Sequence, residues 1–220
     1  MATVKDRVED LISDFYSTDI GADIDSAYSA AVASVADSVK PGILLKALDL
    51  ATNGKTFADA GLVPTVGYKV LEVYRYGSAT QDAGNPVKCH PADWAEFLKT
   101  SKTDSIYEST EYNPVYSIAA GGRIYVSPRT ADASQTNLGL ALVFPYPTAI
   151  VDADYVADMP NELTQSVVLK TAINLLQSYI GNASQEEEDA EIMQLVQAQT
   201  GQYQAEFDRE MQRYIEGTGE

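Results

Sequence analysis

Residues 113–128 read NPVYSIAAGGRIYVSP, and this stretch carries the clearest strand–turn–strand pattern in the chain. Two runs rich in β-branched and aromatic residues, 115–118 and 123–126, flank a turn that contains Gly121 and Gly122. Glycine readily adopts the positive φ that a tight hairpin turn needs, so the stretch predicts an antiparallel hairpin. A phosphate-binding loop is disfavoured, because neither a lysine nor a helix start follows the two glycines.

The β pattern continues on both sides of this hairpin. Residues 68–76 alternate and are rich in valine and tyrosine, which predicts a strand. Residues 138–146 predict a further strand, and Pro145 suits either an edge strand or the exit from a sheet. Residues 91–98 read as a short helix that starts near its proline.

The pattern changes to helical periodicity towards the N-terminus. Apolar residues recur every three or four positions over residues 3–16 and again over 23–39. Pro41 suits the first turn of a third, shorter helix that ends near Asn53. Helical hairpins are the expected result.

Helical periodicity also returns towards the C-terminus. Residues 160–179 predict a helix, with Gly181 placed to cap it. Ser184 and Glu187 then form a capping-box pattern for a last helix of roughly thirty residues. A narrow apolar stripe runs along that helix through Ile192, Leu195, Val196, Gln199, Tyr203, Phe207 and Tyr214.

These patterns predict an α+β fold. We expect residues 1–56 and 160–220 to form one helical bundle from the N- and C-terminal helices. Residues 57–159 are expected to form an inserted, antiparallel β-rich domain. A chain of 220 residues is long enough for two small domains of this kind.

The charge balance is strongly acidic, with 32 acidic against 15 basic residues and a net charge of −17. Binding to nucleic acid phosphates needs clustered lysine and arginine, so we expect no specific binding to DNA. Like charge can still matter beside DNA, because an acidic surface repels a moving polyanion. The apolar runs are too short to cross a membrane, and the first ten residues lack the core of a signal peptide, so synthesis in a cytoplasm is expected.

No catalytic, cofactor-binding or metal-binding motif is apparent, and we expect no enzymatic activity. Cys89 and His90 are the chain's single cysteine and histidine. As sequence neighbours on a strand they would face opposite ways, which predicts a buried thiol beside an exposed ring rather than a nucleophilic pair. The rival hypothesis, an enzyme with an unrecognised site, predicts a deep pocket around His90, Trp94 and Tyr107.

Fourteen tyrosines are the compositional oddity, and many lie in the β-rich half. Tyrosine combines a large apolar body with a polar tip, which suits surfaces that bury against other proteins. β propensity accounts for some of them. The residues that we expect at protein interfaces are Tyr116, Tyr125, Tyr203, Phe207, Met211 and Tyr214.

The order of these segments resembles the head-to-tail adaptor family of tailed bacteriophages. An alanine-rich helix ends at the step Lys40-Pro41-Gly42-Ile43-Leu44-Leu45, and a strand of the form hydrophobic–x–Val–x–Arg matches residues 70–75. A Cys-x-Pro segment, residues 89–91, leads to Trp94. The family's hairpin pattern matches Pro114, Tyr116, Ile118, Gly122, Ile124, Tyr125, Val126 and Pro128. The remaining matches are Tyr146-Pro147 and a helix start with Pro160, Glu162, Leu163 and Ala172.

This resemblance covers about residues 3–215 and rests on order and spacing rather than on one motif. It implies a structural virion protein of the phage neck, assembled in the host cytoplasm as a ring of identical subunits, commonly twelve. Such a ring sits beneath the portal protein, extends the DNA channel and receives a downstream tail or nozzle protein. The chain departs from the family in its acidic, longer last helix and few basic residues, which argues against gripping DNA. Another neck or tail-connector component is the alternative.

Overall fold

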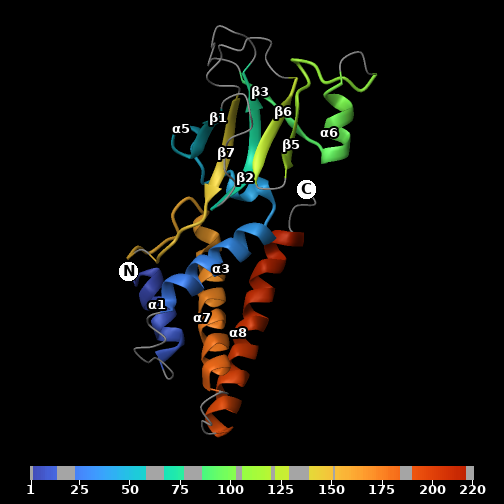
Figure 1. Ribbon diagram of the computed structural model, residues 1–220. Coiled ribbons are helices and arrows are strands. Elements are labelled where there is room, and N and C mark those ends of the chain that lie inside the picture. The colour runs from blue at the N-terminus through green and yellow to red at the C-terminus, as the bar shows by residue number, and fades with distance from the viewer. Residues whose placement is uncertain are drawn as a thin grey trace. The chain divides into compact units, whose positions relative to one another are not determined.

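In the computed structural model, the chain divides into two compact units, which we call the helical unit, Met1–Ala47 with Tyr146–Glu220, and the β unit, Leu48–Pro145 (Figure 1). The residues that the structure describes are 2–13, 23–57, 67–76, 86–102, 106–119, 122–128, 139–150, 152–183 and 190–216. The α+β fold with helices at both ends of the chain is confirmed. No helix among these residues is long and apolar enough to cross a membrane.

The first two helices of the helical unit match their predicted positions in outline. α1, Val4–Leu11, begins at a capping box in which the Asp6 amide donates to Thr3 Oγ1 at 3.1 Å and the Thr3 amide donates to Asp6 Oδ2 at 2.9 Å. α1 ends earlier than predicted, with Ile12 as its C-cap, and residues 14–16 of the predicted helix lie outside the described part. α3, Ile24–Ser38, buries one stripe that consists of Tyr28 and of small or β-branched side chains: Ile24, Ala27, Ala31, Val32, Val35 and Ala36.

α7, Thr164–Ala183, is the central helix of this unit and follows a short 3-10 turn, η2, at Asn161–Leu163. It packs against α1, α3 and α8, which is the last helix, Ala190–Glu216 (Figure 1). A helix with neighbours on several sides needs apolar residues around most of its circumference. The fully buried apolar residues of α7 are Val167, Val168, Leu169, Ala172, Ile173, Leu175 and Leu176.

Two details of these C-terminal helices differ from prediction. Gly181 does not cap α7, because the helix continues to Ala183. The stripe on α8 is buried only in part: Val196 is fully buried, whereas Ile192 and Leu195 are exposed. The predicted capping box at residues 184–187 lies outside the described part.

The predicted third helix is broken into two short pieces. α4, Pro41–Leu44, belongs to the helical unit, and α5, Leu50–Asn53, belongs to the β unit. Asp49 separates them, because its carboxylate accepts from the Ala51 amide at 3.0 Å and starts a new turn. This local bond competes successfully with the continuous helix that periodicity predicted.

The predicted domain boundaries at 56/57 and 159/160 are each displaced in the structure. Residues 48–56 join the β unit because β1, Gly54–Phe57, pairs with the strand β7. Residues 146–159 join the helical unit through hydrogen bonds to its helices. In these, the Val4 amide donates to the Ala153 carbonyl at 2.7 Å, the Ile150 amide to Asp25 Oδ1 at 2.9 Å, and the Tyr146 hydroxyl to Asp37 Oδ1 at 2.8 Å.

The β unit contains two small sheets. The first has the order β1-β7-β2-β3, with β2 at Tyr68–Arg75, β3 at Val87–Lys88 and β7 at Gly139–Pro145, and all its pairs are antiparallel. β7 therefore lies inside the sheet rather than at its edge, and Pro145 is its last residue. The second sheet has the order β4-β5-β6, with β4 at His90–Pro91, β5 at Val115–Ala119 and β6 at Arg123–Ser127.

The predicted hairpin is confirmed as β5 and β6, which pair Val115 with Ser127 through Ala119 with Arg123. Gly122 adopts a φ of 72°, as such a turn requires. The pairing of β4 with β5 is parallel, a short exception to the expected antiparallel region. Side chains from both sheets form one core: Phe57, Val73, Cys89, Ile124, Val126, Ala141 and Val143.

The close fit around Gly139 gives a stability prediction. A Cβ atom there would lie 2.2 Å from the Tyr74 carbonyl oxygen and 2.8 Å from Phe57 Cζ. We expect Gly139→Ala to lower the free energy of unfolding of the β unit by about 1–3 kcal/mol, measured in urea by the fluorescence of Trp94, the single tryptophan. Gly201→Ala is the matched control. It adds a Cβ in open space within α8 and should stabilise the helical unit by about 0.5–1 kcal/mol, measured by circular dichroism. An unchanged midpoint for Gly139→Ala would contradict the described packing.

Candidate functional site

Two neighbouring pockets in the β unit lie beside α6, Trp94–Thr100. The helix starts one turn later than predicted, because Asp93 caps it by accepting from the Glu96 amide at 2.7 Å. Pro91, which was predicted near the helix start, instead lies in β4 beside β5. This cap positions Trp94 at the first turn.

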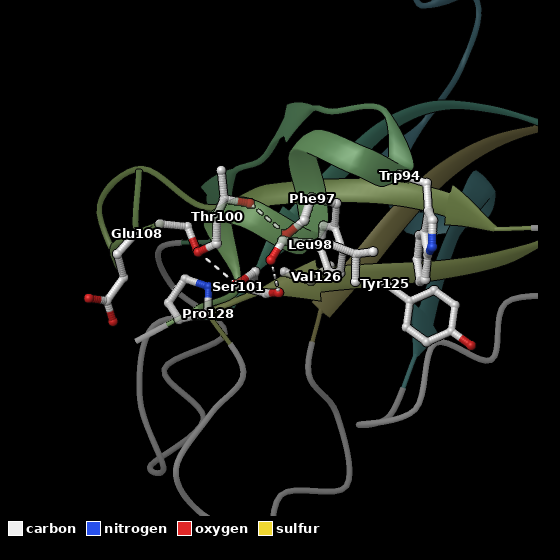
Figure 2. Close-up of a pocket in the computed structure, with 11 residues that line it drawn as sticks. Trp94, Phe97, Leu98, Thr100, Ser101, Glu108, Tyr125, Val126 and Pro128 are labelled. Atoms are coloured by element: carbon white, nitrogen blue, oxygen red, sulfur yellow. Dashed lines mark hydrogen bonds between the residues drawn. The ribbon is translucent and has the colours of Figure 1, made fainter. Parts of the chain in front are cut away.

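A first pocket of about 490 Å³ lies between α6 and β6 (Figure 2). Three aromatic rings border it: Trp94 packs on Phe97 with ring centroids 5.6 Å apart, and edge-to-face on Tyr125 at 5.3 Å. These separations fall in the range of favourable aromatic pairs. The rings therefore form a preassembled apolar wall.

Hydroxyl groups form part of the opposite wall of this pocket, and their hydrogen bonds are made within the chain. Ser109 Oγ bonds to Ser127 Oγ at 2.8 Å, and the Ser109 amide donates to the Thr100 carbonyl at 3.0 Å. Thr100 Oγ1 donates to the Phe97 carbonyl at 2.9 Å. These bonds fix the segment that carries Glu108 against the end of α6.

A second pocket of about 400 Å³ lies beside the first and shares Thr100, Glu108 and Ser109 with it. His90 and Tyr107 line this pocket, whereas Trp94 lines the first one. The rival enzyme hypothesis placed His90, Trp94 and Tyr107 around one deep pocket, and the structure divides them between these two neighbouring pockets. His90, Glu96 and Tyr107 are exposed, so water solvates them and no dry catalytic chamber surrounds the imidazole.

Cys89 and His90 lie as the sequence predicted, with the thiol buried in the core and the imidazole exposed. Burial raises the pKa of the Cys89 thiol from 9.0 to about 12, because the thiolate would lose its hydration, and the nearby Arg75 charge opposes this only in part. A neutral, inaccessible thiol is a poor nucleophile. The pair is therefore not arranged for covalent catalysis.

Arg75 is a feature that sequence reasoning missed. Its side chain is only 1% exposed, and its Nε donates to the Pro128 carbonyl at 2.8 Å. Nη2 lies 3.9 Å from a carboxylate oxygen of the exposed Glu111, and Nη1 has no hydrogen-bond partner within the described ranges. The guanidinium ties β2 to the end of β6. An arginine on an alternating strand gives no signal that it points inward.

The predicted interface residues fall into two groups. On the hairpin, Tyr116 and Tyr125 are half-buried, Tyr116 against the core of the β unit and Tyr125 against α6. On α8, Tyr203, Phe207 and Met211 are buried and pack inside the helical unit. Tyr214 is half-buried and donates to the Glu162 carbonyl at 3.0 Å.

Tyr203 has a definite role within the chain. Its hydroxyl donates to the carbonyl of Leu11 at the end of α1 at 2.8 Å and accepts from Gln199 Nε2 at 2.7 Å. Gln199 Nε2 also reaches the Leu11 carbonyl at 3.3 Å. These bonds satisfy one of the carbonyls that a helix end leaves open.

Within the described residues, no three His, Cys, Asp or Glu side chains converge to hold a metal ion.

The tie between α8 and α1 can be tested directly. We expect Tyr203→Phe to reduce the free energy of unfolding of the helical unit by about 0.5–1.5 kcal/mol, because the partly buried Leu11 carbonyl loses the shorter of its two side-chain hydrogen bonds and Gln199 Nε2 loses an acceptor. Tyr214→Phe removes a similar bond at a more exposed position and should cost less. Urea titrations followed by circular dichroism at 222 nm would measure both. Equal effects of the two variants would contradict the assigned burial.

The state of Cys89 can be tested by thiol labelling. At pH 8 the native protein should react with a disulfide reagent much more slowly than the protein in urea, because the thiol is both buried and protonated in the fold. Raising the pH to 9, where an exposed thiol is half ionised, should still leave the native protein slow. Native labelling at the rate of a free thiol would show that Cys89 is accessible.

The chain was also compared with known proteins. No family model matches it, and no curated protein matches it either.

Proposed function

We propose that this protein is a non-catalytic structural subunit, a head-to-tail adaptor of a tailed bacteriophage. In this proposal, identical copies form a closed ring, a dodecamer, between the portal protein and a downstream tail or nozzle protein. The ring extends the channel through which DNA passes without specific binding. A different neck or tail-connector component, assembled with another symmetry, is the alternative.

The observation that carries the proposal is the uneven distribution of charge between the two units. The helical unit holds 22 acidic and 7 basic residues, a net charge of −15, whereas the β unit holds 10 and 8, a net charge of −2. A catalytic protein has no general need for such a division. A channel for DNA does, because an acidic wall repels the phosphates and keeps the polyanion moving.

The arrangement of the helical unit gives a second line of support. α7 and α8 form a long antiparallel pair to which α1 and α3 add from the other end of the chain (Figure 1). This order agrees with what the family resemblance implies. A ring requires two different complementary faces on each subunit, and a helical layer with exposed apolar positions such as Ile192 and Leu195 offers candidates for such faces.

Exposed acidic residues on α8 can be replaced in a variant that changes the charge of the assembling subunit without changing its folded core. Glu206 and Asp208 are exposed on α8, and replacing both by amides leaves the buried side of the helix intact. Copies that repel each other through the helical unit should assemble more readily when these charges are removed or when salt screens them.

Native mass spectrometry of the protein with its portal tests the proposal. We expect a complex whose mass contains a fixed multiple of the 23.8 kDa chain, twelve for a dodecamer, and Glu206→Gln with Asp208→Asn should shift its midpoint of assembly to lower protein concentration. Wild-type protein in higher salt is the matched comparison. A monomer that never joins the portal under either condition would refute the adaptor function, and a different fixed multiple would favour the alternative neck component.

A further inference from the structure

A long part of α8, residues 192–205, contains no charged residue. The helical unit around it holds 22 acidic and 7 basic residues. Two large aliphatic side chains of this stretch are in contact with water, since Ile192 is 40% exposed and Leu195 57%. Exposed aliphatic residues in a region that lacks charge are typical of a place where another protein binds.

Helical geometry places much of this stretch on one outward face. Four exposed residues recur at steps of three and four and therefore share that face: Leu195, Ala198, Gln202 and Ala205. We call these four residues the outer face of α8. Val196 lies about 100° further round the helix than Leu195 and is fully buried. The outer face and the buried stripe of α8 therefore point in different directions.

α3 has a second outward face without charge. No charged residue occurs between Asp25 and Asp37. Both of these carboxylates accept hydrogen bonds within the chain, Asp25 from the Ile150 amide and Asp37 from the Tyr146 hydroxyl. Three small residues in this interval recur at steps of four and three, and we call them the outer face of α3: the exposed Ser26 and Ala30 and the half-buried Ala33.

The two outer faces are separate surfaces of the helical unit. α3 crosses α7 obliquely, whereas α8 runs beside α7 (Figure 1). The outer face of α8 carries a projecting leucine, and the outer face of α3 carries only small side chains, which allow a second helix to approach closely. Two different, complementary faces are what a repeating contact between identical ring subunits requires.

The charge of the helical unit limits where two copies can touch. Units that each carry −15 repel one another, and a carboxylate that is buried in a contact without a cation costs free energy. Copies are therefore expected to meet where neither surface brings a carboxylate, and the two outer faces satisfy this condition. Glu206 lies one turn beyond Gln202 at the border of the α8 face, so its neutralisation should favour a contact there.

We propose that the outer face of α8 of one copy packs on the outer face of α3 of the next copy. Leu195 lies among the small side chains of α3 in this contact. The inference rests on the proposed ring, because it names the surfaces that join neighbouring subunits. Since every copy offers both faces, the same contact repeats from subunit to subunit until the ring closes.

Adjacent positions on α8 provide a matched pair of variants. Ala198→Glu adds a carboxylate to the outer face, whereas Gln197→Glu adds the same charge at an exposed position about 100° away. Native mass spectrometry with the portal, at about 150 mM salt, gives the protein concentration at the midpoint of ring assembly. We expect Ala198→Glu to raise this concentration by about tenfold or more and Gln197→Glu to change it by less than about twofold. Adding Ala30→Lys to Ala198→Glu should restore assembly, because the two new charges attract across the contact.

Disulfide crosslinking identifies the two surfaces without a measurement of affinity. A chain with both Ala198→Cys and Ala30→Cys should form a ladder of covalent oligomers under mild oxidation, because each copy is linked to the next. Gln197→Cys with Ala30→Cys is the control and should form little of this product. Cys89 stays in place, because its thiol is buried. Circular dichroism would verify that each variant is folded.

The outcomes distinguish this contact from the proposed function. A wild-type protein that never joins the portal would refute the ring and the contact together. A ring that forms equally well with Ala198→Glu, or equal shifts for Ala198→Glu and Gln197→Glu, would overturn the contact alone. Covalent dimers from Ala198→Cys alone would mean that two α8 faces meet each other. A loss of assembly that Ala30→Lys does not restore, with no crosslinked ladder, would make the portal the partner of the α8 face.

Discussion

The burial of α7 is the constraint on which the helical unit depends. This helix contacts α1 and α3 from the beginning of the chain and α8 from its end, and its apolar residues have no other place to be shielded from water. Because the N- and C-terminal helices must meet around it, the intervening residues can only form an insertion. The β unit is that insertion, and it has its own core between two small sheets.

Sequence periodicity predicted the elements that local signals determine. The β5–β6 hairpin, the strand β2, and the helices α3, α7 and α8 all follow from spacing, glycine placement and side-chain type. The failures lie where a tertiary contact or one local bond outweighs periodicity. Asp49 interrupts a predicted helix, and the α7 helix continues through Gly181, which was predicted to cap it. Of the two positions that Pro145 allowed, an edge strand or the exit from a sheet, the structure has the exit, because β1 and β2 pair on both sides of β7.

Surface properties were harder to predict than elements. The stripe on α8 was expected to serve an interface, and the spacing of Tyr203, Phe207 and Met211 gave no signal that they are buried within the helical unit. The two pockets beside α6 were anticipated only as one hypothetical pocket around His90, Trp94 and Tyr107. Their actual lining depends on contacts between α6, β6 and residues 106–109, which are distant from β6 in sequence and give no periodic signal. Charge, in contrast, is a property of composition, and its division between the units became visible once the boundaries were known.

The position of α7 also fixes an order of events during synthesis. The N-terminal helices leave the ribosome long before their packing partner does, since more than a hundred residues separate α3 from α7. Contacts of such long sequence separation form slowly, and exposed apolar faces meanwhile invite aggregation. The β unit, whose strands are complete by Pro145, can close first. α1 and α3 then have to wait, unpaired, until the C-terminal third of the chain emerges.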